Sequence, residues 1–250
     1  MMLSNDHAVS ILPLTLKEPG YDPDRDFAPV GGIATFVNAL ALPVTSGASR
    51  ASGIADVRGA GSPIDLDSFV RAVQAGTLRG AVGVPAPASI PAFAVQSIGR
   101  AKGVALDVLP YRGSVPLLAD LLAGQIPAGV GSVPEFLHLH REGRVRVIAV
   151  MGAQRDQRLP EVPTFAELGV KGFERQAFYG LYAPAATPGA VMTRLSRDLA
   201  TALARSALAE RLQADGHNVA PLAPKALAAH QKDYTAAWRP IIEASGFQRS

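Results

Sequence analysis

The residues that most often carry enzyme chemistry are few and scattered in this sequence. His138 and His140 are two positions apart, and on a helix such a pair does not share a face. The neighbours Asp6 and His7 do not make a catalytic triad, because a triad is defined by its arrangement in space. The chain contains no HExxH, nucleophile-elbow, Walker or dinucleotide-binding motif. The sequence therefore predicts a protein that is not an enzyme and that uses no cofactor or metal.

Ser89 is the residue whose surroundings best suit the binding of an anion. It stands at the start of a predicted helix that extends to Lys102 and stops at Gly103. Unpaired backbone N–H groups and the helix dipole attract negative charge to such a start. Two features weaken this interpretation: Ser89 could simply cap its own helix, and Pro91 removes one of the first-turn donors.

A strand, a loop and a helix are predicted between residues 104 and 125. Apolar and polar residues alternate from 104 to 109, Pro110 is expected to end the strand, and Ser114 is expected to cap the helix. Four leucines make the apolar helix face, and Gly124 supplies the left-handed exit. In α/β proteins the loop at the carboxyl end of a strand commonly binds the ligand.

The remaining segments alternate between strand and helix patterns. Strands are expected at 30–36, 38–44, 80–84, 126–130, 145–151 and 178–183, and helices at 11–17, 66–74, 134–141, 164–168, 191–203, 207–215 and 225–245. Pro127 suits an edge strand or a bulge, and 45–63 is expected to be a loop. Such alternation predicts an α/β fold with a mostly parallel sheet.

Composition excludes several classes of protein. With 48% hydrophobic and 18% charged residues, the 250-residue chain should form one large α/β domain or two small lobes. The net charge of +3 is scattered, so no nucleic acid is expected as a partner. The absence of Cys excludes disulfides and thiolate metal sites. No apolar run is long enough for a membrane span, and the first residues lack the pattern of a signal peptide.

Several short motifs follow one another along the chain. They are Tyr-Asp-Pro at 21–23, Asp-Phe-Ala-Pro-Val at 26–30, Pro-Tyr-Arg-Gly-Ser at 110–114, Asp-Leu-Leu-Ala-Gly-Gln at 120–125, Gly-Arg-Val-Arg-Val-Ile-Ala-Val at 143–150, Leu-Pro-Glu-Val-Pro-Thr at 159–164, and the glycine-containing segments at 169–174 and 180–188. This collinear series resembles the substrate-binding proteins of tripartite tricarboxylate transporters, the Bug or TctC-like proteins. Each motif alone is weak, but the series covers nearly the whole chain and is specific.

The resemblance implies a periplasmic-binding-protein type II-like fold, in which two α/β lobes are joined by two crossing segments. Residues 1–44 and 178–250 would form lobe 1, and residues 45–177 would form lobe 2. Members of the family capture a small carboxylate between the lobes in the periplasm and deliver it to membrane permease subunits, without performing chemistry.

The chain departs from the family pattern at its start. It begins where the family is already in its second or third strand, so lobe 1 is expected to lack its first strand–helix unit and the secretory signal. If this start is genuine, a cytoplasmic location follows. Two alternatives stay open on this basis, an effector-sensing domain of a cytoplasmic regulator with the same fold and a non-functional truncated remnant.

The resemblance also indicates where the ligand should be bound. The expected binding residues are Ser4, Asn5, His7, Asn38, Ser89, Arg112, Phe178 and Tyr179. Asn38 can donate from its amide, and Arg112 stands where the family commonly has Lys and could hold a carboxylate with two parallel hydrogen bonds. An Asp6 carboxylate facing the ligand would repel it, so Asp6 is expected to favour an amine or to point outward.

Overall fold

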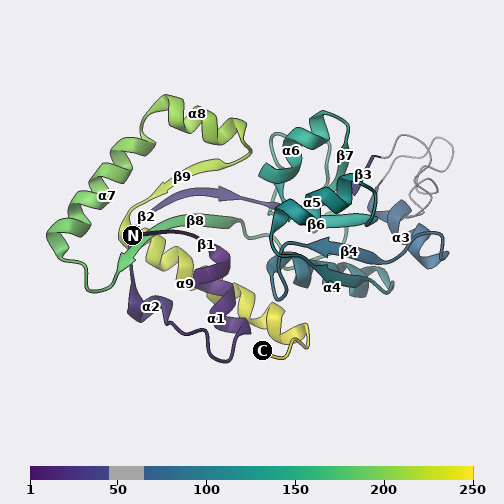
Figure 1. Cartoon of the computed structure of the whole chain (residues 1–250), viewed down its shortest axis with the longest axis horizontal. Helices are drawn as coiled ribbons and strands as arrows, with labels where there is room; N and C mark the ends of the chain where they lie inside the picture. Colours follow the sequence, from purple (N-terminus) through teal and green to yellow (C-terminus); the bar gives the residue numbers. More distant parts are fainter. Residues whose placement is uncertain (45–64, 250) are drawn as a thin grey trace. The chain divides into compact units, whose positions relative to one another are not determined.

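The computed structural model describes residues 1–44 and 65–249, which form two compact units (Figure 1). Unit 1 comprises Met1–Phe36 and Ala177–Ser250, and unit 2 comprises Val37–Gln176. Each unit has one β-sheet with helices packed against it. The loop expected at 45–63 lies outside the described residues.

The sheet of unit 1 has the strand order β1-β8-β2-β9, and every neighbouring pair is antiparallel. The strands are β1 (Met2–Asn5), β8 (Ala177–Pro184), β2 (Phe27–Phe36) and β9 (Asn218–Leu222). The prediction of a mostly parallel sheet is wrong here. Its physical reason is that β2 carries the chain out of unit 1 and the adjacent β8 carries it back, so the two strands must run in opposite directions.

Helices cover both faces of this sheet. They are η1 (His7–Ile11, a π-helix), α1 (Leu12–Thr15), α2 (Pro23–Asp26), α7 (Gly189–Leu203), α8 (Ser206–Ala214) and α9 (Pro224–Ala244). A Cβ atom on Gly180 of β8 would lie 2.9 Å from Leu227 of α9, whereas one on Gly31 of β2 would lie 2.8 Å from Leu199 of α7. Gly180 pairs with Gly32, and successive strand residues point to opposite faces, so α9 and α7 pack on opposite sides.

The sheet of unit 2 has the order β5-β4-β6-β3-β7. Its strands are β3 (Asn38–Pro43), β4 (Ala81–Val84), β5 (Asp107–Pro110), β6 (Ala128–Ser132) and β7 (Val145–Val150), and its helices are α3 (Leu66–Gln74), α4 (Ile90–Lys102), α5 (Ser114–Leu122) and α6 (Val133–Arg141). β4 pairs in parallel with β5 and β6, whereas β3 pairs antiparallel with β6 and β7. Unit 2 therefore has a mixed sheet.

Three local predictions in unit 2 are wrong. β6 lies inside the sheet and not at its edge, because it begins at Ala128 and Pro127 costs the ladder no donor. Gly113, with a φ of 98°, is the N-cap of α5, and Ser114 is already its first residue. The helix expected at 164–168 is a single turn, in which the Leu168 N–H donates to the Thr164 carbonyl over 3.2 Å.

Candidate functional site

One edge of the unit 2 sheet collects the polar residues expected to bind the ligand. β4, β5 and β6 are parallel, so their carboxyl ends share this edge. The antiparallel β3 begins there, with Asn38 paired to Ser132 at the end of β6. Ser89 follows the loop after β4, and Arg112 follows β5. The fold therefore brings Asn38, Ser89 and Arg112 to one edge, from segments that are distant in the sequence.

Ser89 caps α4 at this edge. Its hydroxyl accepts a hydrogen bond from the Ala92 N–H at 3.4 Å and donates to the Ala86 carbonyl at 2.7 Å, and the residue is 4% exposed. The preceding Ala88 has a φ of 47°, a left-handed conformation that is unfavourable for a residue with a Cβ. Strained backbone of this kind concentrates at ligand-binding loops. The start of α4 also presents the positive end of the helix dipole to the edge.

Arg112 lies in a turn that is fixed beside this loop. The Tyr111 N–H donates to the Val84 carbonyl and the Gly113 N–H donates to the Pro85 carbonyl, both at 2.8 Å. The Arg112 side chain is exposed, and it forms no ion pair with any residue in the described ranges. A guanidinium without a carboxylate partner is available to an incoming anion.

Asn38 is held from both sides of β3. Its carbonyl accepts the Met151 N–H at 2.7 Å, and the residue is 8% exposed. Opposite it, the Ser132 N–H donates to the Glu135 carboxylate at 2.8 Å at the start of α6. Ser132 was not among the expected ligand residues, although its Ser-x-x-Glu spacing is the signal of a capping box and could have located it.

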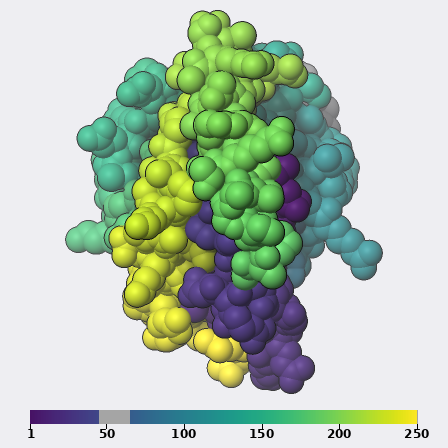
Figure 2. Space-filling model, turned by 90° about the vertical axis from the view of Figure 1, so that its left-hand side faces the viewer, coloured from purple at the N-terminus to yellow at the C-terminus, as the bar shows by residue number. Residues whose placement is uncertain are grey.

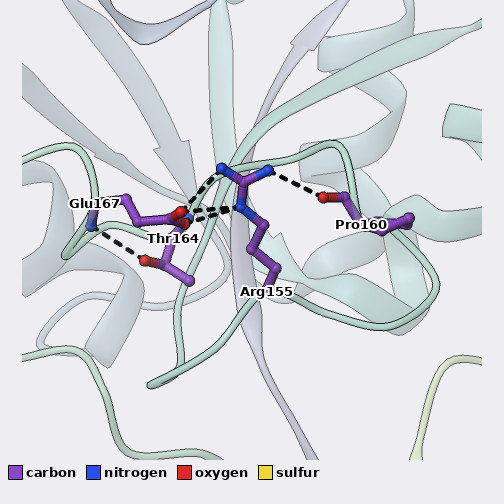
Figure 3. A network of polar contacts seen from close by, with 4 residues as sticks. All are labelled: Arg155, Pro160, Thr164 and Glu167. Atoms are coloured by element: carbon purple, nitrogen blue, oxygen red, sulfur yellow. Dashed lines mark hydrogen bonds and ion pairs between the residues drawn. The ribbon is translucent and has the colours of Figure 1, made fainter.

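A clamp of polar contacts fixes the chain that follows β7 (Figure 3). Arg155 lies between Glu167 and Pro160: its Nη2 donates to the Glu167 carboxylate at 2.9 Å and its Nη1 to the Pro160 carbonyl at 3.1 Å. The Arg155 hydrogen bond lowers the pKa of Glu167 to about 2. The Glu167 carboxylate also accepts the Thr164 N–H at 2.6 Å. Thr164 in turn bridges to Val150 at the end of β7, so the clamp fixes the loop at the same edge.

In unit 1 the expected residues gather where β1 ends. Ser4 is 6% exposed, and its hydroxyl donates to the Asn5 carbonyl at 3.1 Å. Asn5 is half-buried and lies opposite Tyr179 in the β1–β8 pair. Burial lowers the pKa of His7 below its usual 6.5, so this side chain is neutral at pH 7. It can donate or accept a hydrogen bond without adding a charge.

Asp6 does not point outward. Its carboxyl group is 4% exposed and accepts a hydrogen bond from the hydroxyl of Tyr234 on α9 at 2.8 Å. Burial raises the pKa of Asp6 to about 7, although the bond from Tyr234 opposes the shift. This contact ties the end of β1 to a helix that lies 228 residues further along the chain. The expectation that Asp6 faces solvent or an amine ligand is therefore wrong.

The two expected aromatic residues have different surroundings. Phe178 is 2% exposed and meets the rings of His230 and Tyr234 edge to face, at 4.9 and 5.3 Å between centroids. Tyr179 is half-buried and stacks on Phe36 at 4.8 Å. Phe178 is thus part of the unit 1 core, while Tyr179 belongs to an aromatic group at the end of the sheet.

These residues suit recognition of a polar group by hydrogen bonds. Among the described residues no group of His, Cys, Asp and Glu is arranged to hold a metal ion. In residues 1–44 and 65–249 we also find no helix whose length and apolar character would let it span a bilayer.

Comparison with known proteins decides the family. The family model described as "Tripartite tricarboxylate transporter family receptor" matches residues 3–247, which is nearly the whole chain. The chain belongs to this family. A UPF0065 protein of Pseudomonas sp. (strain P51) is 31% identical over 223 residues, which are 89% of this chain and 62% of the relative. The chain thus spans less than two thirds of the length of this relative.

Two solved structures establish the fold of this receptor. The R. palustris protein Rpa4515 with adipate superposes with a TM-score of 0.83 at 24% identity, over 98% of this chain and 77% of that one. MatC from Rhodopseudomonas palustris with bound malate gives a TM-score of 0.79 at 24% identity, over 96% of this chain and 78% of that one. The fold is therefore that of the periplasmic binding proteins.

Proposed function

We propose that this receptor is a solute-binding protein that captures a small carboxylate and delivers it to the membrane permease of a tripartite tricarboxylate-type transporter. The observation that carries the proposal is the family match over residues 3–247. The adipate and malate held by Rpa4515 and MatC indicate the size and charge of the ligands to test first.

The edge of unit 2 is the proposed carboxylate site. The start of α4 favours an anion, the Asn38 amide offers a donor, and the Arg112 guanidinium offers a charge that no described residue neutralises. Ser4, Asn5, His7 and Tyr179 of unit 1 are proposed as further ligand contacts. Phe178 can act only through packing, because its ring is enclosed by α9.

A screen of organic acids tests this proposal. We expect adipate, malate or a related acid to raise the unfolding temperature, because a ligand that binds only the folded state stabilises it. Calorimetry should then show binding that Asn38→Ala and Arg112→Gln each weaken by roughly tenfold, since each removes a hydrogen bond to a charged ligand.

The matched control is Ser97→Ala. Ser97 lies on α4 beyond its first two turns, so its removal should leave the affinity unchanged. If no small carboxylate binds at millimolar concentration, or if Ser97→Ala weakens binding as much as Asn38→Ala, the proposed site is wrong.

A further inference from the structure

A second cavity lies wholly within unit 1 and shares no residue with the expected carboxylate site. Its volume is about 480 Å³, within the range of small-molecule sites. One wall is the α9 helix, and the other is the segment from Pro19 to Asp24. η1 and α1 close the cavity with the apolar side chains of Val9 and Leu14.

The two walls carry opposite charges. Lys232 and Arg239 are seven residues apart on α9, so they lie on one face of the helix, and both line the cavity. Asp22 and Asp24 line it from the other wall. Within the described part of the chain, no ion pair joins either cation to a carboxylate. The opposed charges therefore stay too far apart to neutralise one another directly.

The nearby hydrogen bonds hold the acidic wall in place without consuming its charge. One Asp22 oxygen accepts the N–H groups of Asp24 and Arg25 at 3.0 and 3.3 Å. The Arg25 side chain pairs with Asp26. At the base of the cavity Gln231 donates to Asp24 at 3.4 Å and accepts the Tyr182 hydroxyl at 2.9 Å.

We propose that this cavity binds a small zwitterion, such as an amino acid or a short peptide, with its carboxylate at Lys232 and Arg239 and its ammonium group at Asp22 and Asp24. A ligand with only a carboxylate would be repelled by the acidic wall, and one with only an amine would be repelled by α9. A molecule that carries both charges satisfies both walls.

Calorimetry with a ladder of ω-amino acids tests the site on the full chain. The probes are glycine, 4-aminobutyrate, 6-aminohexanoate and diglycine, with hexanoate and hexylamine as singly charged comparisons. We expect one length of zwitterion to bind best, and the singly charged compounds to bind at least tenfold more weakly. Equal binding of hexanoate and 6-aminohexanoate would overturn the assignment, as would the absence of binding by every zwitterion at millimolar concentration.

Variants of exposed residues locate the binding. Arg239→Gln and Asp24→Asn should each weaken the best zwitterion by tenfold or more, and Lys225→Gln, on the same helix outside the cavity, should not change it. Asn38→Ala should also leave zwitterion binding intact, which separates this site from the proposed carboxylate site. If Arg239→Gln binds the zwitterion as tightly as the unmodified chain, the proposal is wrong.

Discussion

Asp6 shows how one residue can change its chemistry when the chain folds. In the sequence it is an acidic residue within a polar segment, where a solvated carboxylate is the ordinary expectation. In the structure it is buried against Tyr234, and its pKa rises to about 7. Its proton therefore becomes linked to folding near neutral pH.

Replacing Asp6 by Asn should remove this linkage. Between pH 3.8 and about 7 the unfolded chain releases the Asp6 proton while the folded chain keeps it. Stability therefore falls as the pH rises through this range, and the change ends above the folded pKa. Asp6→Asn should gain stability at pH 8, by up to roughly 4 kcal/mol, and little at pH 4. Urea unfolding at both pH values measures this, and an equal effect at the two would contradict the assigned pKa.

Helix α7 shows what a single glycine does for an element. Figure 2 looks onto unit 1, where α7 (green) lies along the surface, and only Leu203 of this helix is fully buried. A Cβ atom on Gly31 would lie 2.8 Å from the Leu199 side chain and 3.1 Å from the Leu222 carbonyl. The close approach of α7 to β2 thus depends on the missing side chain.

Gly31→Ala should therefore loosen α7. We expect a loss of stability of about 1–3 kcal/mol from overpacking, with faster amide exchange along the helix. Gly189→Ala is the matched control, because a Cβ atom there has no neighbour within 4 Å, and it should be neutral or slightly stabilising. Equal exchange rates in the two variants would show that Gly31 does not limit the packing.

At the scale of the whole molecule, the two units differ in how the chain builds them. Unit 2 is one continuous segment, Val37–Gln176, whereas unit 1 combines Met1–Phe36 with Ala177–Ser250. β1 and β2 both pair with β8, so the sheet of unit 1 requires residues from both ends of the chain. Such long-range pairs form late, because a long loop must close first.

The isolated segment 37–176 should fold by itself. It contains a complete five-stranded sheet and its own buried residues, among them Phe69, Phe136 and Leu121. We expect helix and strand signals by circular dichroism and a cooperative urea transition. Residues 1–36 alone should be unfolded, since β8 and α9 are missing from them. A disordered 37–176 segment would contradict the independence of the unit 2 core.

The sequence by itself determined the local elements and the family. Helices α3, α4 and α7 and strand β7 lie where periodicity and caps placed them, because these signals act over a few neighbouring residues. The collinear motifs were enough to indicate a tripartite tricarboxylate transporter receptor, and the family match confirms it. Strand β9 escaped prediction, because Pro221 and a weak alternation obscure a strand formed through its pairing with β2.

Only the tertiary structure decided strand direction and the surroundings of individual side chains. The burial of Asp6, the position of Ser132 opposite Asn38, and the charged walls around the unit 1 cavity all join segments far apart in the chain. No local pattern records such contacts, because they arise when strands pair and helices pack. The expected ligand residues in the two units stay a prediction for the binding measurements to test.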